Sequence, residues 1–195
     1  RYDRIYDAAA KNGIQIVATL CPEDPTGWTA ATPLYHSRVN LNDPAVRAEA
    51  RIYLRKVVGR YKDNPAQGVW LLMNEPNKYD TEPATFHAFG DWLQAKYGSI
   101  DNLNRQWFQT LNKFSDVRIT PDQLTSYWTD YHAVIDWKNF NVDNLINQLT
   151  WVKQQVEAID PNHPTHFNVT RPTGDANGQD VWKEKTVPDI VGASM

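Results

Sequence analysis

Residues 69–80 read VWLLMNEPNKYD, and this stretch carries the strongest fold signal in the chain. Five apolar or aromatic residues run directly into Asn74 and Glu75, and Pro76 then ends the run. A short apolar run bounded by polar residues and proline is typical of a buried strand, which would deliver its last side chains to the edge of a sheet. We therefore predict a strand over 68–74.

Strand-like and helix-like patterns alternate along the rest of the chain. Further strands are predicted at 14–20, 165–170 and 189–194. Helices are predicted at about 1–11, 44–61, 82–97, 99–108 and 121–159, the last with a break near 133–136. Loops are predicted at 21–42, at 109–120 and after 170.

Local signals mark the ends of several predicted helices. Asp43 precedes Pro44, which suits the first position of a helix, and Ser99 precedes the helix that follows. Gly13 and Gly98 stand where helical patterns stop.

The order of these elements, with strands separated by helices, is the signature of a parallel α/β sheet. The strands are short and apolar on both faces, as expected when helices cover the sheet. Two architectures fit, a doubly wound sheet or about four strands of a (β/α)₈ barrel. Both place active sites at the carboxyl ends of the strands, where the predicted long loops lie.

Composition narrows the functional classes. The 195 residues carry a net charge of −3, which argues against a nucleic-acid partner, and no apolar run is long enough to span a membrane. Cys21 is the only cysteine, so an internal disulfide is impossible. The sequence has no glycine-rich nucleotide fingerprint. It opens in a helical pattern and stops on a strand, so we expect a piece of a longer protein.

Asn74 and Glu75 are the main candidates for chemistry. A carboxyl group held near apolar walls at a strand end keeps its proton to higher pH and can protonate a leaving group. The Asn74 amide can hydrogen-bond a hydroxyl beside the reacting carbon. The alternative is a carboxylate that caps the next helix, and the strand-end position alone leaves both open.

Other candidates carry weaker signals. Trp28 lies in a predicted loop and suits either stacking on a sugar ring or packing in the loop, whereas Trp70 lies inside a strand and is expected in the core. His163 and His166 flank Pro164, and we expect no metal site there because no further ligand is evident. The motif NVT begins at Asn168 but falls in a predicted buried strand, so we expect no glycosylation.

The stretch FGDWLQAKYGSIDNLNRQWF (89–108) resembles the segment after the acid/base strand of glycoside hydrolase family 42, the β-galactosidases. The matching residues are Trp92, Leu93, Lys96, Tyr97, Gly98, Leu103, Asn104 and Trp107. SRVNLNDPAVR (37–47) resembles that family's arginine-containing loop. The resemblance implies that residues 1–195 form part of one (β/α)₈ catalytic domain, from about the second helix to the sixth strand, truncated at both ends.

The resemblance also implies a retaining hydrolase of terminal β-galactosides. Glu75 would be the general acid/base, with Asn74, Arg38 and Trp28 binding a carbohydrate substrate. The nucleophile would be a glutamate outside the chain, because Glu23, Asp24 and Asp175 are weak substitutes. No cofactor is implied, and a homo-oligomer is possible.

Three departures from the family pattern keep other substrates open. Pro76 replaces the family's usual aromatic, the run after Trp107 lacks its usual Gly-Thr, and the last strand reads GASM in place of an aromatic-rich run. Another β-glycoside of mannan, glucan or agar type, or a non-catalytic carbohydrate-binding barrel, therefore stays an alternative.

Overall fold

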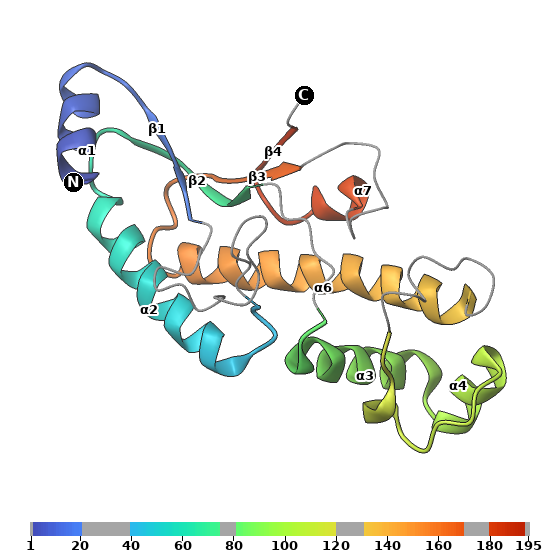
Figure 1. Ribbon diagram of the computed structural model, residues 1–195. Helices are drawn as coiled ribbons and strands as arrows, with labels where there is room; N and C mark the ends of the chain where they lie inside the picture. Colours follow the sequence, from blue (N-terminus) through green and yellow to red (C-terminus); the bar gives the residue numbers. More distant parts are fainter. Residues whose placement is uncertain (1, 21–39, 75–80, 120–130, 170–179, 194–195) are drawn as a thin grey trace.

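The computed structural model describes residues 2–20, 40–74, 81–119, 131–169 and 180–193, and Figure 1 labels the helices and strands. The helical elements are α1 (Tyr2–Lys11), α2 (Pro44–Tyr61), α3 (Pro83–Tyr97), α4 (Ile100–Trp107), the 3-10 turn η1 (Phe114–Asp116), α6 (Tyr131–Glu157) and α7 (Val181–Glu184). The strands are β1 (Ile16–Thr19), β2 (Gln67–Asn74), β3 (Thr165–Val169) and β4 (Ile190–Ala193). All four predicted strands are confirmed, and β1 is shorter than expected.

The predicted helix ends are confirmed at α2, α3 and α4. The Asp43 carboxylate accepts from the backbone N–H of Ala45 at 2.7 Å, which satisfies a donor that the start of α2 would otherwise leave without a partner. Ser99 accepts in the same way from Asn102 N–H at 3.3 Å. Gly98 ends α3 with φ at +73°, a conformation that a side chain would strain.

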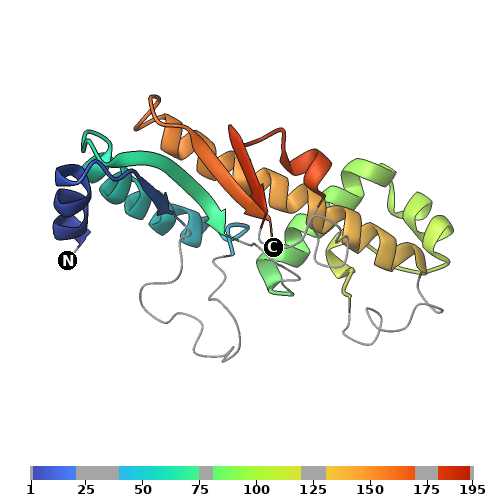
Figure 2. The ribbon, with the colours of Figure 1, turned by 90° about the horizontal axis from the view of Figure 1, so that it is seen from above.

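The four strands form one parallel sheet in the order β1-β2-β3-β4. Their carboxyl ends meet at one edge, as Figure 2 shows from above. Helices α2 and α6 lie on the same face of this sheet (Figures 1 and 2). Sequential strand order with helices on one face is the arrangement of successive βα units in a (β/α)₈ barrel, whereas a doubly wound sheet reverses its order and is covered on both faces.

The expectation that helices cover the sheet is confirmed for the face that α2 and α6 occupy. Within the described residues, no helix packs on the opposite face, which we call the open face. Val17 of β1 and Ile190 of β4 lie on it with 54% and 43% of their surface exposed. In a barrel this face is the interior, which is why its strands are apolar on both sides.

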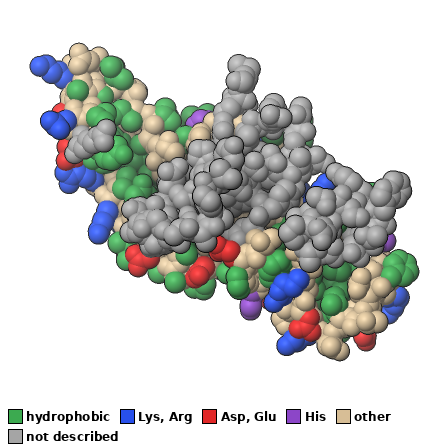
Figure 3. All heavy atoms as spheres, viewed as in Figure 1, with side chains coloured by type: hydrophobic (Ala, Val, Ile, Leu, Met, Phe, Trp, Pro, Cys, Tyr) green, Lys and Arg blue, Asp and Glu red, His purple; other side chains and the backbone are tan. Residues whose placement is uncertain are grey.

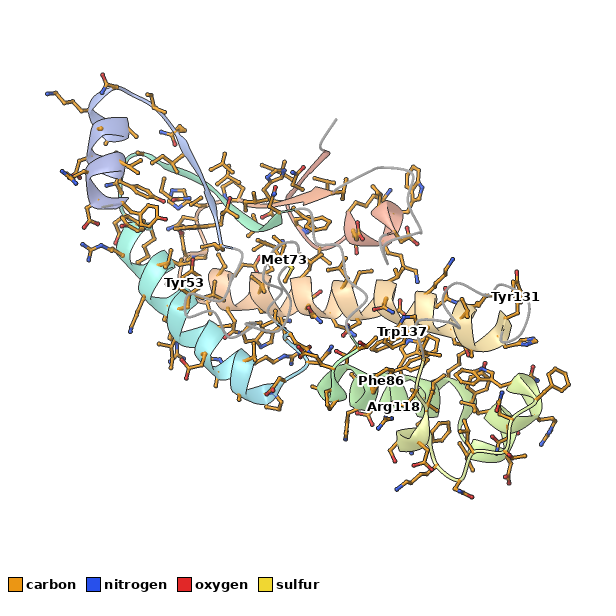
Figure 4. The ribbon with its side chains drawn as sticks, in the orientation of Figure 1. Tyr53, Met73, Phe86, Arg118, Tyr131 and Trp137 are labelled. Carbon is orange, nitrogen blue, oxygen red and sulfur yellow. The ribbon has the colours of Figure 1, made fainter. Side chains whose placement is uncertain are left out.

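The main core lies between the sheet and the two helices α2 and α6. Figure 4 places Met73 of β2 between the sheet and α6. The other buried residues of this core come from both layers and include Leu54, Val58, Trp70, Leu72, Leu145, Leu149, Val152, Val156, Phe167 and Val169. Burying these side chains supplies the hydrophobic stabilisation of this layer.

A second, aromatic core lies where α3, α4 and η1 pack on the other side of α6. Phe86 of α3 and Trp137 of α6 lie together between these helices in Figure 4, with ring centroids 5.6 Å apart. Phe89 meets the edge of Trp137 at 5.0 Å, and the Arg118 guanidinium lies 5.1 Å from the Phe86 ring centroid. These contacts join the α3–α4 segment to the barrel layer.

The predicted break near 133–136 is wrong, because α6 runs continuously through it. The stretch holds no glycine or proline that would interrupt a helix. Asp136, a charge in the middle of an apolar surface, is 2% exposed and accepts from Lys96 Nζ, from Tyr97 Oη at 2.6 Å and from Trp107 Nε1 at 3.0 Å. Three donors compensate the burial of this carboxylate, so the helix continues.

The short elements α7 and η1 were not predicted. α7 forms because the Asp180 carboxylate accepts from the backbone N–H groups of Trp182 (3.0 Å) and Lys183 (3.2 Å). On the face shown in Figure 3, acidic and basic side chains of the described residues lie intermixed. None of the described helices is long and apolar enough to cross a membrane.

Candidate active site

Asn74 is the last residue of β2, and a register shift decides which face of the sheet it occupies. Leu71 and Met73 pair with consecutive residues of β3, so Leu72 is an extra residue in the strand. Side chains alternate between faces, so an extra residue reverses the faces of those that follow. Met73 therefore packs in the helix-side core, and Asn74 is exposed on the open face.

Asn168 of β3 lies beside Asn74. Phe167 and Val169 are buried in the helix-side core, whereas His166 and Asn168 alternate onto the open face and are half-buried. The strand register pairs Asn74 with Asn168, and Asn168 Nδ2 donates to Asn74 Oδ1 at 2.9 Å. Two side-chain amides are thus held together at the carboxyl edge of the sheet.

Gly192 of β4 makes room for this row of side chains. It pairs with Asn168, and a Cβ atom there would lie 2.6 Å from His166 Nε2 and 3.5 Å from Asn168 Oδ1. A larger residue would therefore displace the His166 ring. Burial lowers the pKa of His166, which favours a neutral imidazole.

A buried polar network fastens the start of α2 to the start of α3. Asn40 is 4% exposed, and its Nδ2 donates to Glu82 Oε2 at 2.9 Å and to Thr85 Oγ1 at 3.0 Å. Its Oδ1 accepts from the backbone N–H of Asn42 at 3.0 Å. Asn40 follows Arg38 by two positions, so this network anchors the chain next to a predicted sugar-binding residue.

Of the predicted site residues, the structure describes only Asn74. Trp28, Arg38 and Glu75 lie outside the described residues, as do Glu23, Asp24 and Asp175. Glu75 follows Asn74, the last residue of β2, directly in the sequence.

The opposite edge of the sheet holds a structural cluster. Trp70 is fully buried, as predicted, and its Nε1 donates to Asp160 Oδ2 at 2.8 Å. His163 Nδ1 lies 2.7 Å from the same oxygen. Burial raises the pKa of Asp160, but the hydrogen bonds from Trp70 and His163 outweigh it, so the net pKa is below the ordinary value.

His163 and His166 therefore have different surroundings. His163 precedes β3 and contacts Asp160, whereas His166 lies within the strand. Among the described residues, no group of three or more His, Cys, Asp or Glu side chains is placed to hold a metal ion.

The sequence analysis did not single out Asn168 as a site residue. It lies near the end of β3, but its neighbours in THFNVT alternate polar and apolar, unlike the continuous apolar run that singled out Asn74. Its pairing with Asn74 depends on a contact between residues 94 apart and on the extra residue in β2, which sequence patterns do not reveal.

The strands form a parallel sheet in sequential order, with helices on one face. Polar side chains lie on the open face at the carboxyl edge. Together these features define a segment of an enzyme-type (β/α)₈ barrel. The beta-galactosidase model of glycoside hydrolase family 42 matches residues 2–193. The chain belongs to that family.

Relatives and solved structures agree with this assignment. Beta-galactosidase BglY of Alicyclobacillus acidocaldarius subsp. acidocaldarius is 28% identical over 153 residues, which cover 76% of this chain and 22% of that protein. The crystal structure of a beta-galactosidase from Bacillus circulans sp. alkalophilus matches with TM-score 0.84 and 20% identity, over 100% of this chain and 32% of that one.

A family 42 exo-carrageenase from Bacteroides ovatus is also similar, with TM-score 0.65 and 20% identity over 82% of this chain and 24% of that one. At these identities the structural matches establish the fold alone. The chain spans less than a third of the length of each of these three proteins.

Proposed function

We propose that residues 1–195 are part of the catalytic (β/α)₈ domain of a longer retaining glycoside hydrolase that cleaves terminal β-galactosides. The observation that carries this proposal is the family match over residues 2–193, together with the position of Asn74 at the carboxyl edge of the sheet. Glu75, the next residue in the chain, is the proposed general acid/base.

The proposed mechanism uses two carboxyl groups about 5–5.5 Å apart. Glu75 protonates the glycosidic oxygen while a glutamate from a later strand attacks the anomeric carbon and forms a glycosyl-enzyme. The Glu75 carboxylate then takes a proton from water, which attacks the same carbon and releases the sugar with retained configuration. Asn74 hydrogen-bonds the hydroxyl next to that carbon, and Arg38 and Trp28 bind the sugar.

The test compares the full-length protein with its Glu75→Gln variant on nitrophenyl β-galactoside. We expect the variant to lose about 100-fold or more in kcat, because general acid/base catalysis typically contributes that much. Azide attacks the glycosyl-enzyme without needing a base, so it should restore the rate and yield a β-galactosyl azide. A variant as active as the parent would show that Glu75 is not the acid/base and that its carboxylate serves only as a cap.

A second candidate substrate is the β-linked galactan of carrageenan or agar type. The reason to test it is that a family 42 protein of similar fold, from Bacteroides ovatus, is an exo-carrageenase. Assaying the same enzyme pair on carrageenan oligosaccharides and on lactose separates the two substrates. A protein that binds galactosides without hydrolysing any of these substrates would be the non-catalytic barrel.

A further inference from the structure

The side-chain amides of Asn74 and Asn168 are joined in one defined direction. Asn168 Nδ2 is the donor and Asn74 Oδ1 the acceptor, at 2.9 Å. The acceptor Oδ1 and the donor Nδ2 of an asparagine side chain leave the amide carbon in two different directions. Since Oδ1 of Asn74 is turned toward Asn168, its Nδ2 points in another direction.

From this geometry we infer that Asn168 is a positioning residue for Asn74. It fixes the rotation of the Asn74 amide so that Nδ2 is presented to the substrate hydroxyl next to the anomeric carbon. The inference rests on the proposed function, because it assigns Asn168 a role in the same site. Asn168 acts through Asn74 and is not itself assigned a contact with the sugar.

Three features of the sheet support this role. The register sets Asn74 and Asn168 side by side on adjacent parallel strands, and the extra residue in β2 brings Asn74 onto the face that Asn168 occupies. Phe167 and Val169 are 0% and 1% exposed, which fixes the backbone on both sides of Asn168. A side chain held by a strand between two buried neighbours is more precisely placed than one on a loop.

The Asn168→Asp substitution tests the direction of the hydrogen bond. A carboxylate has the same shape as the amide but only accepts hydrogen bonds. Asn74 would have to turn and donate its Nδ2 to the introduced carboxylate, presenting Oδ1 to the substrate. Asn168→Ala removes the donor without favouring the reversed orientation, so the loss of activity should be larger for the aspartate than for the alanine.

The full-length protein is assayed on dinitrophenyl β-galactoside and on its 2-deoxy analogue, which lacks the hydroxyl in question. We expect Asn168→Asp to lower kcat about 100-fold on the galactoside, the typical effect of losing one transition-state hydrogen bond, with a smaller change in KM. On the 2-deoxy analogue the loss should fall below about threefold. In an Asn74→Ala background, Asn168→Asp should add little, because the residue it orients is gone.

Two controls separate this role from a general effect on folding or charge. Asn102→Asp makes the same change on α4, at an exposed position outside the proposed site, and should leave both rates unchanged. The thermal unfolding midpoint of each variant reports whether it is folded. An Asn168→Asp variant that fails to fold is replaced by Asn168→Ala, for which the same substrate comparison applies with a smaller expected loss.

The outcomes are distinct. Equal losses on the two substrates, or a loss that persists in the Asn74→Ala background, would overturn the positioning role while leaving the proposed hydrolase intact. Wild-type rates for Asn168→Asp would do the same. A parent protein that cleaves no β-galactoside would overturn the proposed function and this inference together.

Discussion

At the scale of single residues, Glu184 has the most perturbed carboxyl group among the described residues that the proposed mechanism does not use. It is fully buried on α7, and its Oε1 accepts from the backbone N–H of Asp180 at 2.9 Å. Its Oε2 has no hydrogen-bond partner within the described part of the chain. Burial raises the pKa of Glu184 to about 7, and the nearby Asp180 charge adds to this, while the Asp180 N–H bond opposes it.

The raised pKa predicts a pH-dependent stability. The ordinary pKa is 4.5, so between pH 4.5 and about 7 the folded state binds the Glu184 proton more tightly than the unfolded state does. Stability from this group is therefore greatest below pH 4.5 and falls as pH rises to about 7. We expect Glu184→Gln to raise the thermal unfolding midpoint of the full-length protein at pH 8 and to have less effect at pH 5.

The matched control for that prediction is Glu49→Gln, at an exposed position on α2. Its unfolding midpoint should follow the parent at both pH values. If Glu184→Gln raised the midpoint equally at pH 5 and pH 8, the buried carboxyl group would be charged at both pH values. The expectation that it is protonated at pH 5 would then be wrong.

Residues whose role depends on partners a few positions away along the chain could be predicted from the sequence. Asp43 and Ser99 cap their helices as expected because a cap bond reaches only two or three positions along the chain. Asn74 could be singled out because it ends a continuous apolar run. Asn168 and Asp136 could not, because their partners are brought to them by the sheet register and by helix packing.

At the scale of elements, the stretch 89–108 that carries the family resemblance has a structural role in the described residues. Lys96, Tyr97 and Trp107 all donate to Asp136 of α6. Asn104 bonds the backbone N–H and C=O of residue 111, both at 2.8 Å. These side chains of the motif therefore fasten α3 and α4 to α6.

Removing the shared acceptor tests this role. Asp136→Ala leaves Lys96, Tyr97 and Trp107 without their common partner, and the loss should cost about 3 kcal/mol of local stability. Native-state hydrogen exchange of the α3, α4 and α6 amides in the full-length protein measures this loss of stability.

Asp116→Ala is the control, because the ion pair of Asp116 with Lys113 is long (3.7 Å) and partly exposed. This substitution should change the stability by less than about 0.5 kcal/mol. Protection factors in α6 that match the parent after Asp136→Ala would mean that aromatic packing alone holds this segment.

At the scale of the whole molecule, the alternation of strands and helices was enough to predict a parallel sheet but left two architectures open. Strand order and the side on which helices pack distinguish them, and both are long-range properties. The resemblance to family 42 selected the barrel before the sheet order did. The continuity of α6 was not predicted because the buried Asp136 carboxylate is stabilised by hydrogen-bond donors from α3 and α4, which a sequence pattern does not reveal.

The same sheet predicts how the 195 residues behave when expressed alone. Among the described strands, β1 and β4 each pair on one side only, and the open face displays apolar residues such as Val17 and Ile190. Unpaired strand edges and exposed apolar surface promote association between copies. We expect the 195-residue chain to elute from size-exclusion chromatography as large species, with light scattering far above its mass of 22.4 kDa.

A charge on the exposed edge should oppose this association. Val17→Lys places an ammonium group on β1 at a position that is 54% exposed, and it should shift the population toward smaller species. Arg4→Lys keeps the charge of α1 unchanged, at a position away from the sheet, and should elute like the parent. A parent chain that elutes as a monomer and unfolds cooperatively would show that the open face and edges are covered by the chain itself, and that these 195 residues form a self-sufficient domain.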